Sequence, residues 1–249
     1  MGRAPRGSLV VPDDALGVVV FAHGSGCSRF SPRNRHVAHH LQACGIGTLL
    51  VDLLTGEEEH DRAAVFDVHL LAERLVAVTE WLRHERAAQG LSIGYFGAST
   101  GAAAALWAAA DALGLVRAVV SRGGRPDLAW QGLPAVRVPT LLIVGGADHV
   151  VLDLHREAAR QLRCDHRLDV IPGVTHLFEE SGALAQVATH AVVVRALLRR
   201  SLIPASATPA PAQLRRAGAQ SRTGRFSGRE LRGAGRARGP RRRLVRRGS

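Results

Sequence analysis

Short apolar runs recur along the chain and alternate with longer segments in which apolar residues follow a helical spacing. The runs at 17–22 (GVVVFA), 47–53 (GTLLVDL) and 138–144 (VPTLLIV) are almost continuously apolar, which is typical of strands buried on both faces. Further short strands are predicted at 9–11, 91–96, 115–120 and 168–171. This alternation predicts an α/β fold: a mainly parallel sheet with helices on both of its faces.

Helices are predicted between these strands. Ser31 and Pro32 provide an N-cap and a first-turn proline for a helix that ends before Gly45. Apolar residues at helical spacing predict a longer helix over about 65–88. Other helices are expected over 101–112, 151–162 and about 182–200.

The composition changes after Pro204, where Pro, Ala and Ser give way to Arg and Gly with few apolar residues. We therefore expect one folded domain over 1–203 and a disordered, basic tail over 204–249. The tail from residue 213 onward holds 13 Arg and one Glu, and so carries the whole net charge of +12. All 33 basic residues are Arg, so compositional bias is an alternative to a functional tail. A nucleic-acid partner is expected at most weakly, through this tail.

The chain has no apolar run of the roughly 18 residues that a membrane span needs, and its first residues lack the apolar core of a signal peptide. Cys27, Cys44 and Cys164 are odd in number and widely spaced, and none forms a C-x-x-C pair. These features predict free thiols, a cytoplasmic location and no membrane partner.

The segment Gly97-Ala98-Ser99-Thr100-Gly101 reads G-x-S-x-G and lies between a predicted strand and a predicted helix. A serine on such a sharp turn projects its hydroxyl from the edge of the sheet, which makes Ser99 the candidate nucleophile. The alternative is a glycine-rich turn with an incidental serine.

Two further residues follow later strands in the order that a catalytic triad requires. Asp148 follows the strand at 138–144, and His176 follows the strand at 168–171. His176 is the candidate general base, and Asp148 would orient it. Taken alone, Asp148 could equally be a helix N-cap, and His176 an ordinary loop histidine.

A tetrahedral oxyanion needs two N–H donors. We expect one from Thr100, directly after the nucleophile, and the other from Ser25 in the His23-Gly24-Ser25-Gly26 loop. The alternative is that this loop is simply a tight turn without a catalytic role.

The HGSG loop, the GASTG turn, the GGAD turn at 145–148 and the GVTH loop at 173–176 together resemble the α/β-hydrolases. Within that superfamily the chain is similar to the small esterases of the dienelactone hydrolase-like branch, over roughly residues 8–200. The resemblance implies a single-domain α/β-hydrolase without a lid domain, acting without a cofactor or metal on a small-molecule ester, lactone or thioester. Dienelactone hydrolases proper carry Cys where this chain has Ser99, so an ordinary serine esterase is expected. Acyl transfer or C–C bond hydrolysis on the same fold remains an alternative, as does a nucleic-acid-binding protein.

Arg122 and Arg125 follow a strand and are expected on the same rim, where they could bind a carboxylate or phosphate of the substrate. The alternative is structural pairing, for example with Asp127. The acidic cluster at 57–61 (EEEHD) could bind a metal, or form a solvated loop.

Overall fold

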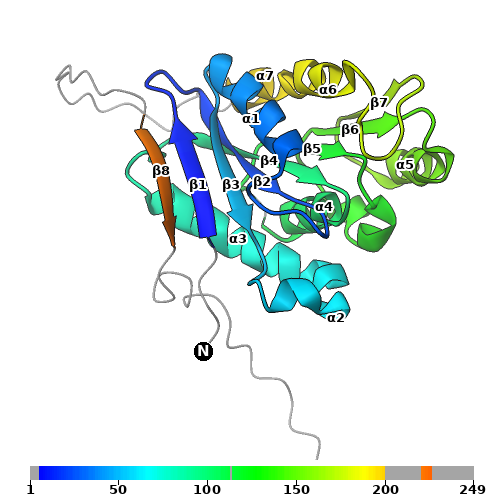
Figure 1. The fold of residues 1–249 in the computed structure, drawn as a ribbon, viewed down its shortest axis with the longest axis horizontal. Helices are drawn as coiled ribbons and strands as arrows, with labels where there is room; N and C mark the ends of the chain where they lie inside the picture. Colours follow the sequence, from blue (N-terminus) through cyan, green and yellow to red (C-terminus); the bar gives the residue numbers. More distant parts are fainter. Residues whose placement is uncertain (1–5, 113, 200–219, 226–249) are drawn as a thin grey trace, which may run out of the picture.

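The sheet is the framework that positions every candidate residue. In the computed structural model, which describes residues 6–112, 114–199 and 220–225, the strands form one sheet in the order β7-β6-β5-β4-β2-β3-β1-β8 (Figure 1). Their bounds are β1 Arg6–Val11, β2 Gly17–Ala22, β3 Gly47–Asp52, β4 Ser92–Ala98, β5 Val119–Arg122, β6 Thr140–Gly145, β7 His166–Ile171 and β8 Gln220–Arg225.

From β3 to β7 all neighbouring strands are parallel, whereas β1 runs antiparallel to both β3 and β8. The continuously apolar strands β2, β3 and β6 are buried along their whole length, as predicted. Because these strands are parallel, their carboxyl ends meet at one edge of the sheet.

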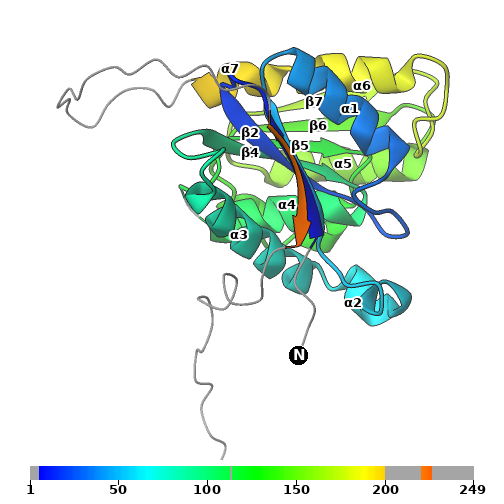
Figure 2. The same ribbon diagram turned by 60° about the vertical axis from the view of Figure 1, so that its left-hand side comes forward.

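Helices cover both faces of the sheet (Figure 2). One face is packed by α1 Pro32–Ala43, α6 Ala183–Ala191 and α7 Val193–Arg199, and the other by α3 Val68–His84, α4 Thr100–Asp111 and α5 His149–Gln161. Side chains of β4 alternate between the two cores, with Tyr95 packed toward α3 and α4 and Phe96 toward α1 and α6. The predicted fold class is therefore confirmed.

The predicted helix boundaries hold where a cap was visible in the sequence. Ser31 caps α1, accepting a hydrogen bond from Asn34 N at 3.5 Å. The helix predicted over 65–88 is divided into α2 Arg62–Phe66 and α3, because Asp67 accepts from Leu70 N at 2.9 Å and starts a new helix. The helix predicted over 182–200 is likewise divided at Val192 into α6 and α7.

The connection between β5 and β6 contains only the short 3₁₀ helices η2 Pro126–Ala129 and η3 Leu133–Ala135. The expectation that no lid domain is inserted there is confirmed. A third 3₁₀ helix, η1 Glu58–His60, follows β3.

Most of the predicted tail, 204–219 and 226–249, lies outside the described residues. Its described segment, β8, pairs along the edge of β1, with Gly7 opposite Gly224 (Figure 1). Pairing of this kind uses backbone N–H and C=O groups, so the polar sequence carried no apolar signal for it. Within the described part of the chain, no helix is long and apolar enough to cross a membrane.

Candidate active site

Ser99 occupies a strained turn between β4 and α4. Its backbone has φ 50° and ψ −123°, outside the regions that side-chain-bearing residues ordinarily adopt. The flanking glycines are required by close packing. A Cβ at Gly97 would lie 2.4 Å from Ala102 Cα, and one at Gly101 would lie 2.2 Å from Ala22 O. The local geometry is thus the tight strand-to-helix turn that the G-x-S-x-G pattern predicts.

Asp148 and His176 are brought together from loops that follow β6 and β7. His176 Nδ1 lies 2.7 Å from Asp148 Oδ2, and the Asp148 side chain is only 14% exposed. Asp148 occupies the N-cap position of α5, but its side chain makes no capping hydrogen bond. The pair, rather than the cap, is therefore the role that the structure gives this carboxylate.

The same edge of the sheet holds Ser99 and His176. Ser99 N donates to Arg122 O at 3.4 Å, which ties the turn to the end of β5. The next residue, Gly123, lies against the histidine loop, since a Cβ there would be 3.3 Å from His176 O. Ser99 and the His176 side chain are both partly exposed, so both are open to solvent.

The two predicted oxyanion donors come from α4 and from the HGSG loop, which lie against each other beside Ser99. Thr100 is the first residue of α4, so its N–H has no intrahelical acceptor. The HGSG loop lies against the serine, since a Cβ at Gly24 would be 2.8 Å from Ser99 Cβ. Ser25 N, however, donates to Thr100 Oγ1 at 3.1 Å. An oxyanion would therefore have to take this donor from a neutral hydroxyl, an exchange that its charge favours.

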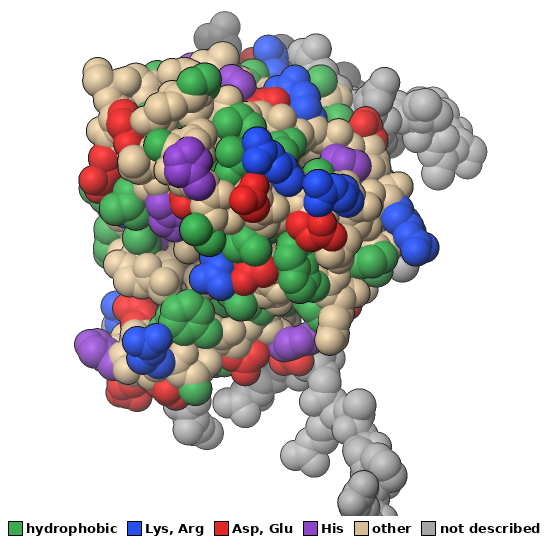
Figure 3. Space-filling view, turned by 90° about the vertical axis from the view of Figure 1, so that its right-hand side faces the viewer, with side chains coloured by type: hydrophobic (Ala, Val, Ile, Leu, Met, Phe, Trp, Pro, Cys, Tyr) green, Lys and Arg blue, Asp and Glu red, His purple; other side chains and the backbone are tan. Residues whose placement is uncertain are grey.

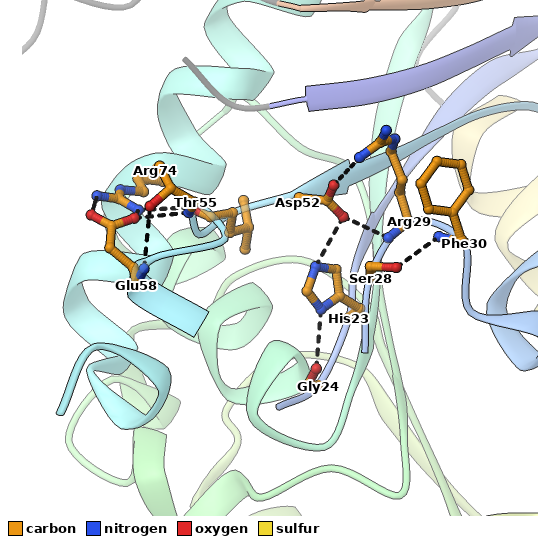
Figure 4. Close-up of polar contacts among 10 residues, drawn as sticks. His23, Gly24, Ser28, Arg29, Phe30, Asp52, Thr55, Glu58 and Arg74 are labelled. Carbon is orange, nitrogen blue, oxygen red and sulfur yellow. Dashed lines mark hydrogen bonds and ion pairs between the residues drawn. The ribbon is translucent and has the colours of Figure 1, made fainter. Parts of the chain in front are cut away.

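Asp52, at the end of β3, anchors the HGSG loop (Figure 4). It lies 3.4 Å from His23 Nε2, accepts from Arg29 N at 2.6 Å and forms an ion pair with the Arg29 guanidinium. Burial alone would raise the pKa of Asp52, but the hydrogen bonds from His23 and Arg29 outweigh it, so its pKa lies below the usual value. The sequence analysis missed this anchor, although the parallel pairing of β2 and β3 would have placed Asp52 beside His23.

The two arginines predicted to bind substrate have different surroundings. Arg125 forms a bidentate pair with Asp127, with contacts of 2.8 and 2.6 Å, and the hydrogen bonds to Asp127 raise the pKa of Arg125. Structural pairing is thus the interpretation that the structure supports for Arg125. Arg122 is buried at the end of β5, beside residues that the sequence analysis did not connect with it, namely Arg33, Asn34 and Phe178. No sequence signal linked these positions, because α1 and β5 are far apart in the chain.

The acidic cluster at 57–61 is mostly exposed, but Glu58 is partly buried and makes structural contacts. Glu58 accepts two hydrogen bonds of 2.7 Å from Arg74 and one of 2.9 Å from Thr55 N (Figure 4). The hydrogen bonds from Arg74 lower the pKa of Glu58 to about 2. Among the described residues, no group of three or more His, Cys, Asp or Glu side chains is placed to hold a metal ion.

Charges on the face that carries α5 and β7 are mixed. Figure 3 shows acidic and basic side chains side by side, with hydrophobic side chains between them. Local contacts, rather than a field of one sign, therefore decide which ligand charge is favoured there. The three cysteines are free and partly buried.

Comparison with known proteins agrees with the fold described above. A model of the dienelactone hydrolase family matches residues 6–197. A crystal structure of a dienelactone hydrolase from Anabaena variabilis is 54% identical, covers 79% of this chain and 91% of its own, and superposes with a TM-score of 0.74. The esterase Est1E from Butyrivibrio proteoclasticus shares the fold at 15% identity, covering 78% of this chain and 95% of its own with a TM-score of 0.65.

Two curated relatives from Mycobacterium tuberculosis, each named "Putative phosphoribosyl transferase", are 60% identical over 182 residues. The match covers 73% of this chain but only 41% of each relative. This chain therefore spans about two fifths of the length of the curated relatives it matches.

Proposed function

Because the chain belongs to the dienelactone hydrolase family, we propose that it is a serine hydrolase that cleaves a small ester, lactone or thioester through an acyl-Ser99 intermediate. The observation that carries the proposal is the pairing of two features at one edge of the sheet. Ser99 stands on a strained turn, and Asp148 holds His176 at 2.7 Å on the adjoining loop.

Each residue has a defined part in the proposed reaction. The Ser99 hydroxyl attacks the acyl carbon while His176 Nε2 accepts its proton, and Asp148 keeps the Nδ1 proton of His176 in place. The developing oxyanion is stabilised by the N–H groups of Thr100 and Ser25. His176 then gives the proton to the departing oxygen or sulfur.

Deacylation repeats these steps with water. His176 takes a proton from water as the water oxygen attacks the acyl carbon, and returns the proton to Ser99 Oγ when the acid leaves. The short β5–β6 connection adds no domain over the rim, which favours a small substrate in an open site. Acyl transfer would use the same intermediate with a different acceptor.

The relatives' name does not lead us to propose phosphoribosyl transfer. The match covers 182 residues, less than half of each of those proteins, so the remainder of their length has no counterpart in it. We assign the hydrolase chemistry to residues 6–197, which the family model matches.

The test is hydrolysis of a panel of short acyl esters and thioesters by wild type, Ser99→Ala and the control Ser92→Ala, which lies at the opposite end of β4. Loss of a triad member removes roughly 10⁴- to 10⁶-fold of the rate. We expect that loss for Ser99→Ala and wild-type rates for Ser92→Ala. Ester hydrolysis retained by folded Ser99→Ala would contradict the proposal.

A further inference from the structure

Both ring nitrogens of His23 face an acceptor. Nδ1 lies 3.0 Å from Gly24 O, and Nε2 lies 3.4 Å from Asp52 Oδ1 (Figure 4). A neutral imidazole carries one N–H and one lone pair, so in either tautomer one nitrogen would present its lone pair to an oxygen. Only the protonated ring, which has two N–H groups, suits both contacts. The His23 side chain is 9% exposed, so water can do little to replace a lost contact.

Asp52 is a suitable partner for a charged His23. Burial alone would raise the pKa of Asp52, but the contacts with His23 and Arg29 keep that pKa below its usual value, so the carboxylate is charged at neutral pH. The other titratable groups around His23 in the described chain are Cys27 and Glu59, which line the same cavity, and Arg29, which is paired with Asp52. Glu59 is exposed, so Asp52 is the carboxylate that sets the charge of His23.

The contact with Gly24 O fixes the peptide that carries one of the predicted oxyanion donors. Gly24 O and Ser25 N belong to the same peptide group, which is planar and trans, so its C=O and N–H point in opposite directions. His23 Nδ1 and Cys27 N, at 3.0 and 3.3 Å, hold the carbonyl on one side. The Ser25 N–H therefore points to the other side, where it donates to Thr100 Oγ1 at 3.1 Å.

A small cavity lies at this donor, beside the nucleophile. His23, Ser25 and Thr100 all line the cavity, whose volume is about 20 Å³. Gly24 lies against the nucleophile, since a Cβ added to it would be 2.8 Å from Ser99 Cβ. A cavity of this volume holds about one water-sized group, so it suits the single oxygen atom of an oxyanion. The charged ring also strengthens the donor, because a hydrogen bond to a peptide C=O polarises the N–H of the same peptide.

We propose that protonated His23 is a positioning residue, which holds the Gly24–Ser25 peptide so that the Ser25 N–H is aimed at the developing oxyanion. The inference rests on the proposed function, because the oxyanion arises from attack by Ser99. It adds a requirement that the triad alone does not impose. His176 must be neutral to accept a proton, whereas His23 must keep both of its protons.

Loss of one proton from His23 would undo this arrangement. The remaining N–H pairs best with the charged Asp52 carboxylate, so the lone pair is left facing Gly24 O. The peptide is then free to turn the Ser25 N–H away from the oxyanion. We therefore expect kcat/KM to rise with pH as His176 becomes neutral, and to fall again on the alkaline side as His23 loses its proton.

The experiment measures kcat/KM for p-nitrophenyl acetate from about pH 5 to 9.5 in wild type, His23→Asn and His23→Leu. Wild type should give a bell-shaped profile. Asn offers a neutral N–H close to the place of Nδ1 and does not titrate, so His23→Asn should lose the alkaline decline and retain more activity than His23→Leu. The Leu variant cannot hold the peptide and should lose about 100-fold in kcat, the cost of one oxyanion donor. The control His84→Asn removes an exposed histidine whose Nδ1 also contacts a carbonyl, Glu80 O at 2.8 Å, and should keep the wild-type profile.

Each other outcome is decisive. A wild-type profile that stays level on the alkaline side would overturn the inference, as would an alkaline decline that persists unchanged in His23→Asn; ester hydrolysis would leave the proposed function standing in both cases. Should the His23 variants fail to fold, Asp52→Asn decides. Without the carboxylate the alkaline decline should move to lower pH by about one unit, and an unmoved decline would overturn the inference.

A second readout covers the case in which wild type does not cleave this ester. The rate at which a fluorophosphonate labels Ser99 then replaces kcat/KM in the same comparison, because phosphonylation also develops negative charge on an oxygen beside Ser99. The same pH profiles are expected, with the alkaline decline absent in His23→Asn. If Ser99 is not labelled at any pH, the proposed function and this inference are overturned together.

Discussion

Replacing Gly101 by Ala sets two effects of opposite sign against each other. Gly101 is the second residue of α4, where Ala in place of Gly would ordinarily stabilise a helix by about 0.5–1 kcal/mol. An ideal Cβ at this position, however, lies 2.2 Å from Ala22 O and 2.5 Å from His23 O. Both atoms are backbone of the segment that leads into the HGSG loop, so neither can turn aside as a side chain would.

The steric effect should win. Overpacking of this kind costs roughly 1–3 kcal/mol, and rigid backbone partners place it at the upper end, for a net destabilisation of about 2 kcal/mol. For a domain of this size that lowers Tm by roughly 4–8 °C. The loop that moves carries Ser25, and a displacement of about 1 Å near the reacting groups costs on the order of 100-fold in kcat.

The assay is thermal unfolding together with kcat on a short ester, for Gly101→Ala and the matched control Gly56→Ala. An added Cβ at Gly56 meets no atom within 4 Å and its φ is not positive, so the control should stay within about 0.5 kcal/mol of wild type. If Gly101→Ala equals Gly56→Ala in both Tm and kcat, the close approach of α4 to the HGSG segment is refuted.

Three further predictions follow from other contacts. Asp148→Asn should lower kcat by about 10⁴-fold, because an amide favours the wrong tautomer of His176. The control Asp153→Asn, on the exposed face of α5, should keep the wild-type kcat. Equal rates in the two variants would exclude Asp148 from the triad. The folded-state pKa of Glu58 lies near 2, below its ordinary 4.5, so the pair with Arg74 should stabilise the fold above pH 4.5 and stop doing so as pH falls toward 2. The free energy of unfolding of Glu58→Gln, measured by urea titration, should lie about 1 kcal/mol below wild type at pH 7 and meet it near pH 2; a gap that does not narrow would contradict this. Deleting residues 200–249 should lower Tm by roughly 2–4 °C, because β1 loses the pairing with β8. Ester hydrolysis should be unchanged, since β8 lies four strands from β4. Salt-sensitive nucleic-acid binding that disappears with the deletion would favour the alternative function of the tail.

The sequence was informative wherever a local rule leaves little choice. Buried parallel strands must be apolar throughout, so β2, β3 and β6 could be read directly, and Ser31 with Pro32 marked the start of α1. The glycines around Ser99 identified the sharp turn because only glycine tolerates the contacts that the structure shows there.

Contacts between distant segments were harder to predict. The pairing of Asp148 with His176 could be anticipated only because both follow parallel strands whose ends meet at one edge. Arg122 was read together with Arg125 from their proximity in sequence. The structure separates them, pairing Arg125 with Asp127 and turning Arg122 toward Asn34 on α1. The hydrogen bond from Ser25 N to Thr100 Oγ1 also depends on tertiary packing, so no local sequence pattern predicted it.

The central claim is that Ser99 is the nucleophile of a serine hydrolase. It is tested most directly by treating the 249-residue chain with a fluorophosphonate and locating the adduct by intact mass and peptide mapping. The account predicts one adduct per chain, on Ser99, formed far more slowly in His176→Ala because the base that activates the hydroxyl is gone. An adduct on another residue would contradict the account. So would ester hydrolysis that neither modifies nor requires Ser99.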